Sequence, residues 1–375
     1  MPKRGENIYK RKDGRWEGRY IKGRDSNGKA MYGYIYADTY RDVKGKLLHI
    51  KHQVETKNAV QHVSQDAFFD EVIDAWLQYI SFNIKESTRA RYRYIVAHYI
   101  RPALGLKLTK ELTAVAVEGF IQSLLYDAAG KVWLSEKTAG DILVIVKAII
   151  KYGNLRGFSI PCNTQNIRIK TITHTGGVIS LDDQQQLSKW LMSDKDPCKL
   201  GVLLSLYTGI RIGELCALKW KHILFEEGIL QVCGTMQRIS KDAHENGAKT
   251  KIIVDNPKSR YSYRDIPLPK FIIDYAAELK CEPEAYVLTG EQDRFIEPRT
   301  LQYRFKRYLE QCGIPYVNFH TLRHTFATRC IELGFEVKSL SEILGHANVN
   351  ITMNRYVHSS MYLKRENMEK LCSIV

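Results

Sequence analysis

The spacing of apolar residues separates a short N-terminal segment of strands from a long, mainly helical remainder. Residues 15–21 and 31–37 alternate in character and are rich in tyrosine, which is typical of strands. Gly, Asn and Asp between them predict a turn. Residues 39–57 then place apolar side chains at helical spacing among many lysines. This pattern predicts a small unit of two strands and one helix.

Residues 66–155 predict a second unit that is helical throughout. Apolar positions recur at helical spacing in four stretches, namely residues 67–80, 86–105, 113–126 and 135–153. We expect the second helix to stop at Pro102 and Gly105. The polar stretch 162–177 shows no clear period and predicts an interdomain linker.

The pattern beyond the linker predicts a third, mainly helical domain. Ser180, with Asp183 three residues later, is typical of a capped helix start. Residues 199–220 predict a buried helix, a break at Gly209 and a second helix. Residues 228–239 and 263–269 predict strands that flank a polar, basic loop. The remainder predicts mainly helix.

The expected fold class is multidomain α+β. It combines a small sheet-plus-helix domain, an all-α domain and a mainly α domain with a small antiparallel sheet. The expected boundaries are 1–60 for the first domain, 66–160 for the second, 161–177 for the linker and 178–375 for the third domain with its C-terminal tail.

Charge indicates what the first unit binds. The chain has 375 residues, with 56 Lys and Arg against 41 Asp and Glu, a net charge of +15. Residues 1–57 alone hold 15 Lys or Arg and 7 Asp or Glu, a net +8. Small size, positive charge and aromatic side chains together favour contact with DNA or RNA over a merely solvated basic face. The candidate contacts there are Arg15, Arg19 and Lys22.

The second predicted helix of the helical unit is also basic. Arg89, Arg91 and Arg93 lie beside tyrosines in the run ESTRARYRYIVAHYIRP. They form either an exposed charged face or a set of phosphate contacts, and the overall charge favours phosphate.

Cysteine usage and hydropathy bear on the compartment. Eight cysteines are scattered singly without a CxxC pair, which argues against a disulfide framework or a structural zinc and fits a reducing cytoplasm. The sequence contains neither a run typical of a signal peptide nor an apolar stretch long enough to cross a bilayer. We expect a cytoplasmic protein that uses no cofactor, no metal and no membrane.

Four stretches of the third domain combine guanidinium, ammonium, imidazole and phenol groups. They are YTGIRIGELCALKW (207–220), NPKSRYSYRDIPLP (256–269), VNFHTLRHTFATRC (317–330) and LGHANVNITMNRYVH (344–358). Arg211 opens a helix, where free N–H groups and the helix dipole favour an anion. His320 and Arg323 share one helix face, and Lys258 lies in a polar turn.

Together, these groups could break a phosphodiester bond without a metal ion. Two guanidiniums can neutralise the charge of a pentavalent transition state. A phenol such as Tyr356 can be the nucleophile, and a lysine or histidine can protonate the leaving oxygen.

Other interpretations remain open on the residues alone. His320 and His324 have the spacing of zinc ligands, but the HExxH glutamate is absent and Arg323 would repel a cation. The Asp182–Asp183 pair fits a helix start better than a metal site. A DNA-binding regulator would share the basic arm and helical unit but would not need the third domain's basic and phenolic groups.

The motifs TGIRIGEL, K-S-x-x-S-x-R-x-I-P-L, HTLRHTFA, LGH and NRY resemble those of the tyrosine recombinases. The resemblance is greatest to integrases of Gram-positive phages and integrative conjugative transposons, and it covers essentially the whole chain. It implies an arm-type DNA-binding domain, a core-binding domain and a catalytic domain. A tyrosine-type topoisomerase shares the chemistry but would not be expected to carry such an arm. The active-site positions implied by the resemblance are Arg211, Lys258, His320, Arg323, His346 and Tyr356, with Glu214 supporting the first arginine.

The resemblance further implies a site-specific recombinase that integrates and excises a mobile element. Tyr356 would form a 3′-phosphotyrosyl link, and strand exchange would pass through a Holliday junction without ATP. The implied partners are double-stranded DNA at core and arm sites, three further copies of the chain in a tetramer, an excision factor and a host DNA-bending protein.

Overall fold

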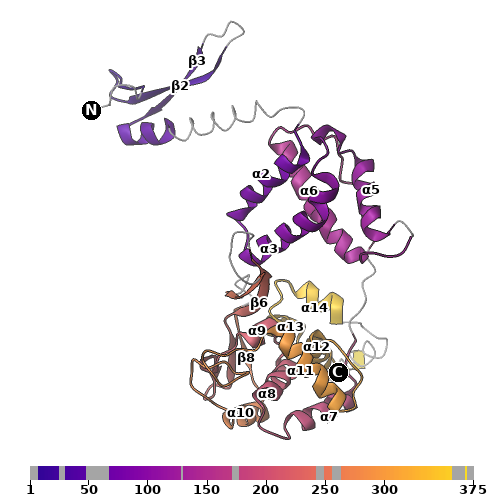
Figure 1. The fold of residues 1–375 in the computed structure, drawn as a ribbon. Coiled ribbons are helices and arrows are strands. Elements are labelled where there is room, and N and C mark those ends of the chain that lie inside the picture. The colour runs from indigo at the N-terminus through magenta and orange to yellow at the C-terminus, as the bar shows by residue number, and fades with distance from the viewer. Residues whose placement is uncertain are drawn as a thin grey trace. The chain divides into compact units, whose positions relative to one another are not determined.

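The computed structural model describes residues 7–24, 30–47, 67–127, 130–170, 177–241, 249–255, 263–356 and 368–369. The chain divides into two compact units, Met1–Ile172 and Thr173–Val375. Figure 1 shows the elements of each, and each unit is described by itself. The expected fold class is confirmed.

The N-terminal segment is a three-stranded antiparallel sheet with a helix on one face. The sheet has the order β1 (Ile8–Lys10), β2 (Trp16–Arg24) and β3 (Ala30–Ala37). Residues 40–47 are helical, and Val43 and Leu47 from this turn of helix pack against Ile8. The two predicted strands are confirmed as β2 and β3. The strand β1 was missed because three residues are too few to show alternation.

The rest of the first unit is a helical domain. Its elements are α2 (Phe69–Ser81), α3 (Glu86–Ile95), the π-helical turn η1 (Val96–Ile100), α4 (Arg101–Leu104), the 3-10 turn η2 (Thr109–Glu111), α5 (Ala114–Leu125) and α6 (Glu136–Leu155). Side-chain oxygens of Thr113 and Ser135 cap the starts of α5 and α6. The apolar faces of α2, α5 and α6 meet in one core, as their periodicity predicts.

The second helical stretch ends at Leu104 with Gly105 as its C-cap residue, so the predicted stop at Gly105 is confirmed and the predicted stop at Pro102 is wrong. The N–H of Arg101 donates to the carbonyl of Val96 five residues back, which is the π-helical pattern. Proline supplies no N–H to the preceding turn. The wider π turn lies directly before the proline and shifts the hydrogen-bond register there, so the chain passes it without leaving the helix.

The first part of the predicted linker packs onto this helical domain. Cys162 and Ile167 are buried in its core. The ammonium of Lys147 on α6 donates to the carbonyl of Ile167 at 2.6 Å. Residues 171–176 lie outside the described residues.

The second unit is mainly helical. Within the described residues its elements include α7 (Leu181–Leu191), α8 (Pro197–Thr208), α9 (Ile212–Cys216), α10 (Lys270–Ala277), α11 (Pro298–Gln311), α12 (His320–Glu332), α13 (Val337–Leu344), α14 (Val349–Tyr356) and the 3-10 turn η3 (Trp220–His222). The oxygen of Ser180 accepts from the N–H of Asp183, so the predicted cap of α7 is confirmed.

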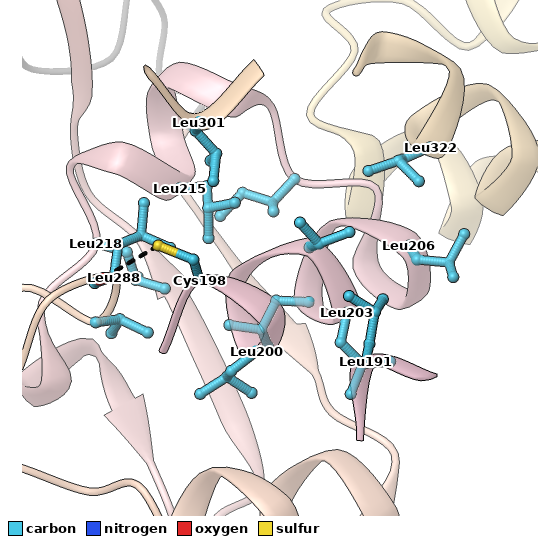
Figure 2. Close-up of a cluster of buried hydrophobic side chains, with 14 of the residues drawn as sticks. Leu191, Cys198, Leu200, Leu203, Leu206, Leu215, Leu218, Leu288, Leu301 and Leu322 are labelled. Carbon is cyan, nitrogen blue, oxygen red and sulfur yellow. Dashed lines mark hydrogen bonds between the residues drawn. The ribbon is translucent and has the colours of Figure 1, made fainter. Parts of the chain in front are cut away.

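The core of the second unit is built around α8. This helix is apolar on nearly all sides and packs against α7, α9, α10, α11 and α12. Figure 2 shows Leu200, Leu203 and Leu206 of α8 among leucines contributed by the surrounding elements. The Sγ of Cys198 donates to the carbonyl of Leu288 at 3.4 Å. A helix buried all round is a rigid support for the residues that follow it.

The strands of this unit form two small antiparallel sheets. They are β4 (Ile223–Leu224), β5 (Ile229–Val232) and β8 (Arg264–Pro267) in one, and β6 (Thr235–Ser240) and β7 (Thr250–Asp255) in the other. The single strand predicted over 228–239 is wrong, since the chain leaves the first sheet at Cys233–Gly234. The strand β7 falls within the stretch for which the sequence predicts a polar loop, because lysines flank its short apolar run.

No helix among the residues that the structure describes is long and apolar enough to span a membrane.

Candidate active site

Arg211 lies where α8 ends and α9 begins. Gly209 ends α8 with φ of 64°, a left-handed conformation that glycine adopts without strain. Arg211 is the N-cap residue of α9, and its side chain is 37% exposed. The prediction that Arg211 opens a helix directly after a glycine break is confirmed. Its guanidinium donates to the carbonyl of Gly345 at 3.3 Å.

Glu214 holds Arg211 from the first turn of α9. Its Oε1 accepts from the Arg211 guanidinium at 2.8 Å, and its Oε2 accepts from the Arg211 backbone N–H at 3.0 Å. Arg264 on β8 donates to the same two oxygens at 3.2 and 2.8 Å. Burial by itself raises the pKa of Glu214, but the hydrogen bonds and charge of Arg264, followed by the charge of Arg211, outweigh it and hold that pKa below its ordinary value.

Arg323 lies in the second turn of α12 and is only 2% exposed. Its guanidinium donates to the carbonyl of Gly209 at 2.7 Å and to that of Leu344 at 2.6 Å. These bonds join α12 to the end of α8 and to the end of α13. The guanidinium thus lies between the two glycine turns that carry Arg211 and His346.

His346 follows the Gly345 turn, which ends α13 with φ of 64°. The Arg323 guanidinium contacts His346 Nε2 at 2.9 Å, and His346 Nδ1 contacts Thr352 Oγ1 at 2.8 Å. Because a guanidinium can only donate, Nε2 accepts. The neutral ring therefore carries its proton on Nδ1 and donates it to Thr352, which is fully buried on α14.

His320 is the first residue of α12 and is exposed, unlike Arg323 one turn later. Its ring meets that of His324 edge-on at 4.7 Å between centroids. His324 is buried, as expected of a structural histidine. Within the described parts of the chain, no group of three or more His, Cys, Asp or Glu side chains could hold a metal ion.

Of two further predicted site residues, Tyr356 is described only by its backbone and Lys258 is not described. Tyr356 is the last residue of α14, and this helix packs against α12 and α13. Lys258 lies outside the described residues, between the end of β7 at Asp255 and the start of β8 at Arg264. The structure thus brings together Arg211, Glu214, Arg323 and His346, and puts Tyr356 on a helix tied to His346 through Thr352.

Sequence reasoning missed the roles of Arg264 and Thr352. Arg264 lies two residues before the buried Ile266, so strand alternation places its side chain on the inward face. An arginine on that face needs a buried partner, which was the available signal. Thr352 lies on α14, four residues before Tyr356 in the sequence.

Of the candidate DNA contacts of the small sheet, Arg15 lies at the start of the central strand and Arg19 lies on the helix-free face. Arg15 directly precedes β2 and donates to Asp13 at 3.0 Å. Arg19 pairs across the sheet with Tyr34, and its guanidinium lies 3.6 Å from the ring centroid of Tyr32. A hydrogen bond with Tyr32 raises the pKa of Arg19. Lys22 lies on β2, but its side chain is outside what the structure describes.

The candidate DNA contacts of the helical domain lie on α3. Arg91 is exposed and pairs with Asp141 of α6 at 2.6 Å. Arg89 and Arg93 are half-buried, and desolvation together with the charge of Arg89 lowers the pKa of Arg93. Arg89 and Arg93 lie one turn apart, so their like charges make this face of α3 positive and repel each other. An anion bound beside them would relieve this repulsion.

Comparison with known protein families identifies the fold and the chemistry. The profile of the Phage integrase family matches residues 178–362, and that of the phage integrase N-terminal SAM-like domain matches residues 68–125. Together these cover more than half of the chain. The chain belongs to the tyrosine recombinase family. It is a recombinase that breaks and rejoins DNA at specific sites.

One relative is similar in sequence, and two solved structures share the fold. A tyrosine recombinase XerC-like protein of Caldanaerobacter subterraneus is 27% identical, over 93% of each chain. A fragment of the Tn1549 transposon integrase, solved with transposon right end DNA, has a TM-score of 0.66 and 19% identity over 82% of this recombinase and 100% of the fragment. A lambda integrase tetramer bound to a Holliday junction has a TM-score of 0.57 and 17% identity over 95% of this chain and 98% of that one.

Proposed function

We propose that this recombinase integrates and excises a mobile DNA element, with Tyr356 as its nucleophile. The observation that carries the proposal is the meeting of Arg211, Arg323 and His346, which come from three separate motifs. Their bonds converge on the turns at Gly209 and Gly345. The same turns lead into α9 and α14, and α14 ends at Tyr356.

The reaction follows from what each group can do. The Tyr356 oxygen attacks the scissile phosphorus, and Arg211 and Arg323 offset the charge on the non-bridging oxygens. Lys258 gives a proton to the departing 5′ oxygen, with His320 and His346 beside the same phosphate. A 3′-phosphotyrosyl link and a free 5′-hydroxyl result. A 5′-hydroxyl of the partner strand then attacks this link and releases the tyrosine, so each bond broken is replaced without ATP.

The domains divide the DNA contacts between them. We assign residues 1–60 to arm-site DNA through Arg15, Arg19 and Lys22, and residues 66–160 to core DNA through Arg89, Arg91 and Arg93. Residues 161–177 then connect these to the catalytic domain, 178–375. The exposed tyrosines and positive charge of the small sheet support the first assignment, and the arginines of α3 support the second.

The proposed assembly is a homotetramer that exchanges strands through a Holliday junction, as the solved lambda integrase tetramer is bound to one. An excision factor and a host DNA-bending protein complete the proposal. A cytoplasmic place of action is supported by the seven cysteines of the described ranges, which are free thiols.

A suicide substrate with a nicked core site tests the nucleophile. The parent protein should form a covalent protein–DNA adduct, because the nicked strand is lost and ligation cannot follow. Tyr356→Phe should bind core DNA normally and form no adduct. Tyr316→Phe is the matched control, since Tyr316 is an exposed tyrosine of the same domain, 64% exposed, and this variant should keep the adduct.

Each other outcome is informative. An adduct that persists in Tyr356→Phe but maps to Tyr362 would move the nucleophile six residues along the tail. Binding without any adduct by the parent would favour a DNA-binding regulator. Relaxation of supercoiled DNA without strand exchange would favour a topoisomerase.

A further inference from the structure

The side chain of Arg264 binds Glu214, the carboxylate that also binds Arg211, and is only 6% exposed. It projects from β8 and donates to both oxygens of Glu214, at 2.8 and 3.2 Å. Its Nε–H donates to the carbonyl of Ile343 at 2.6 Å. One guanidinium therefore joins β8, the first turn of α9 and the end of α13.

The same guanidinium supports the turn that precedes His346. A Cβ added at Gly345 would lie 3.0 Å from Nη1 of Arg264 and 3.2 Å from its Cζ. The carbonyl of Gly345 accepts from Arg211. Arg264 thus contacts one side of the Gly345 turn, and the half-buried Arg211 guanidinium donates to the carbonyl of the same turn.

Arg264 affects the site because its positive charge balances the negative charge of Glu214. Glu214 is 6% exposed and accepts hydrogen bonds from Arg211 and Arg264. If Glu214 faced Arg211 alone, its charge would cancel most of the attraction of Arg211 for an anion, because charges a few Å apart act almost as one from a distance. With Arg264 present, the three groups keep one net positive charge. Arg211, at 37% exposed, is the arginine of the two that can present this charge to DNA.

We propose that Arg264 is a positioning residue of the recombination site, which neutralises Glu214 so that Arg211 keeps both its charge and its orientation for the scissile phosphate. The inference rests on the proposed function of Arg211. The low pKa of Glu214 agrees with it, since the carboxylate stays ionised in a buried place only when it is compensated.

A double-mutant cycle tests the charge balance. Arg264→Gln leaves Glu214 facing Arg211 alone and should slow single-turnover adduct formation on the nicked core site by about tenfold or more. Glu214→Gln combined with Arg264→Gln removes one charge of each sign and should be several-fold faster than Arg264→Gln alone. Arg264→Lys keeps the charge and should stay within about tenfold of the parent protein.

A substrate with no charge at the scissile phosphate distinguishes an electrostatic effect of Arg264→Gln from a structural effect. A methylphosphonate in place of the scissile phosphate carries no charge on its non-bridging atoms, so less compensation is needed there. The defect of Arg264→Gln should shrink on this substrate. A purely structural role would leave the defect the same on both substrates.

Arg329→Gln is the matched control. Arg329 on α12 also donates to a carboxylate, that of Glu332 at 2.6 Å, and to a backbone carbonyl, that of Ile179 at 2.8 Å. It has no contact with Glu214 or Arg211 among those described, and its loss should lower thermal stability without changing the adduct rate of the folded protein.

Three results would overturn the inference. One is a double variant as slow as Arg264→Gln or slower, and another is an equal defect on both substrates. The third is a folded, DNA-binding Arg264→Lys that is as slow as Arg211→Ala, and this test holds even if Arg264→Gln does not fold. Absence of any adduct from the parent protein would instead refute the proposed function.

Discussion

At the scale of single residues, the described site is organised by backbone carbonyls as much as by charges. Arg211 and Arg323 donate to the carbonyls of Gly209, Leu344 and Gly345, all at helix ends. The last carbonyls of a helix lack partners within the helix, so they are available to a guanidinium. Each arginine thereby donates hydrogen bonds to carbonyls that the helix leaves without partners. The same bonds hold its guanidinium in place for an anion.

The role of Lys258 as general acid can be separated from that of the arginines. A 5′-alkoxide is a poor leaving group unless it is protonated, whereas a thiolate, with a thiol pKa of about 8.5, needs little help. Lys258→Ala should be severely slowed on normal DNA and largely restored when sulfur replaces the bridging 5′ oxygen. Arg211→Ala and Arg323→Ala should stay slow on both substrates. Rescue of His320→Ala or His346→Ala instead of Lys258→Ala would identify the histidine as the acid.

Glu214 should contribute to the acid stability of the catalytic domain. Its pKa in the folded protein is lower than the ordinary value of 4.5. The carboxylate therefore stabilises the folded state fully above that value, and this contribution is lost as the pH falls through the lower, folded pKa. Thermal unfolding measured from about pH 6 to pH 3 should show a shallower acid decline for Glu214→Gln than for the parent. Glu226→Gln, which removes an exposed carboxyl, should reproduce the parent curve.

At the scale of elements, the α8–α9 break is the part of the site that sequence predicted best. The apolar run, the Thr-Gly break and the second helix all follow from local pattern, and Arg211 appears as the N-cap residue. The helix through Pro102 and the strand β7 were not predicted. The helix passes Pro102 through a π turn, and β7 has only a short apolar run flanked by lysines, so neither shows the regular period from which an element is predicted.

For the site as well, the sequence predicted the local motifs but not the contacts between separate elements. The motif residues were found because each lies in a recognisable local stretch. The link from Thr352 through His346 to Arg323 joins α14, the turn after α13 and α12, and its donor order depends on which nitrogen of the ring faces the guanidinium. Only the fold supplies that information.

The Gly209 turn offers a test at the same scale. A Cβ there would lie 2.7 Å from Phe326 and 2.8 Å from Leu344, and the glycine has φ of 64°. Gly313 has φ of 67° with nothing within 4 Å of an added Cβ. Gly313→Ala should therefore cost about 1 kcal/mol of unfolding free energy, from backbone strain alone. Gly209→Ala should cost roughly 2 kcal/mol or more, since a clash is added.

The activity of these two variants should differ as well. The Gly209 carbonyl accepts from Arg323, so a displaced turn moves this arginine. Adduct formation by folded Gly209→Ala should fall well below that of Gly313→Ala, with stability measured by urea unfolding. Equal rates per folded molecule would show that the turn tolerates the shift.

At the scale of the whole molecule, the proposed function requires two kinds of DNA contact in one chain. The small sheet has its apolar side covered by residues 40–47 and leaves its other side to tyrosines and Arg19. A face of exposed aromatic and basic side chains is costly for a protein to leave without use, because it promotes association. The catalytic domain, with its own core around α8, does not depend on that face for its fold.

Deletion of residues 1–57 should therefore abolish binding to a distal arm-type site while leaving cleavage at the core site largely intact. The deletion removes a net charge of +8, and each phosphate contact that is lost lowers the slope of log affinity against log salt by about 0.9. The distal complex of the full chain should thus show a steep salt dependence that the truncated protein lacks. Arg19→Ala in the full chain should weaken distal binding in the same direction, because it removes one guanidinium from the exposed face. Gel-shift titrations at several salt concentrations on separate arm and core duplexes measure both effects. Two-site binding that survives the truncation would mean that the aromatic face of the sheet serves packing and that arm recognition, if present, lies elsewhere in the chain.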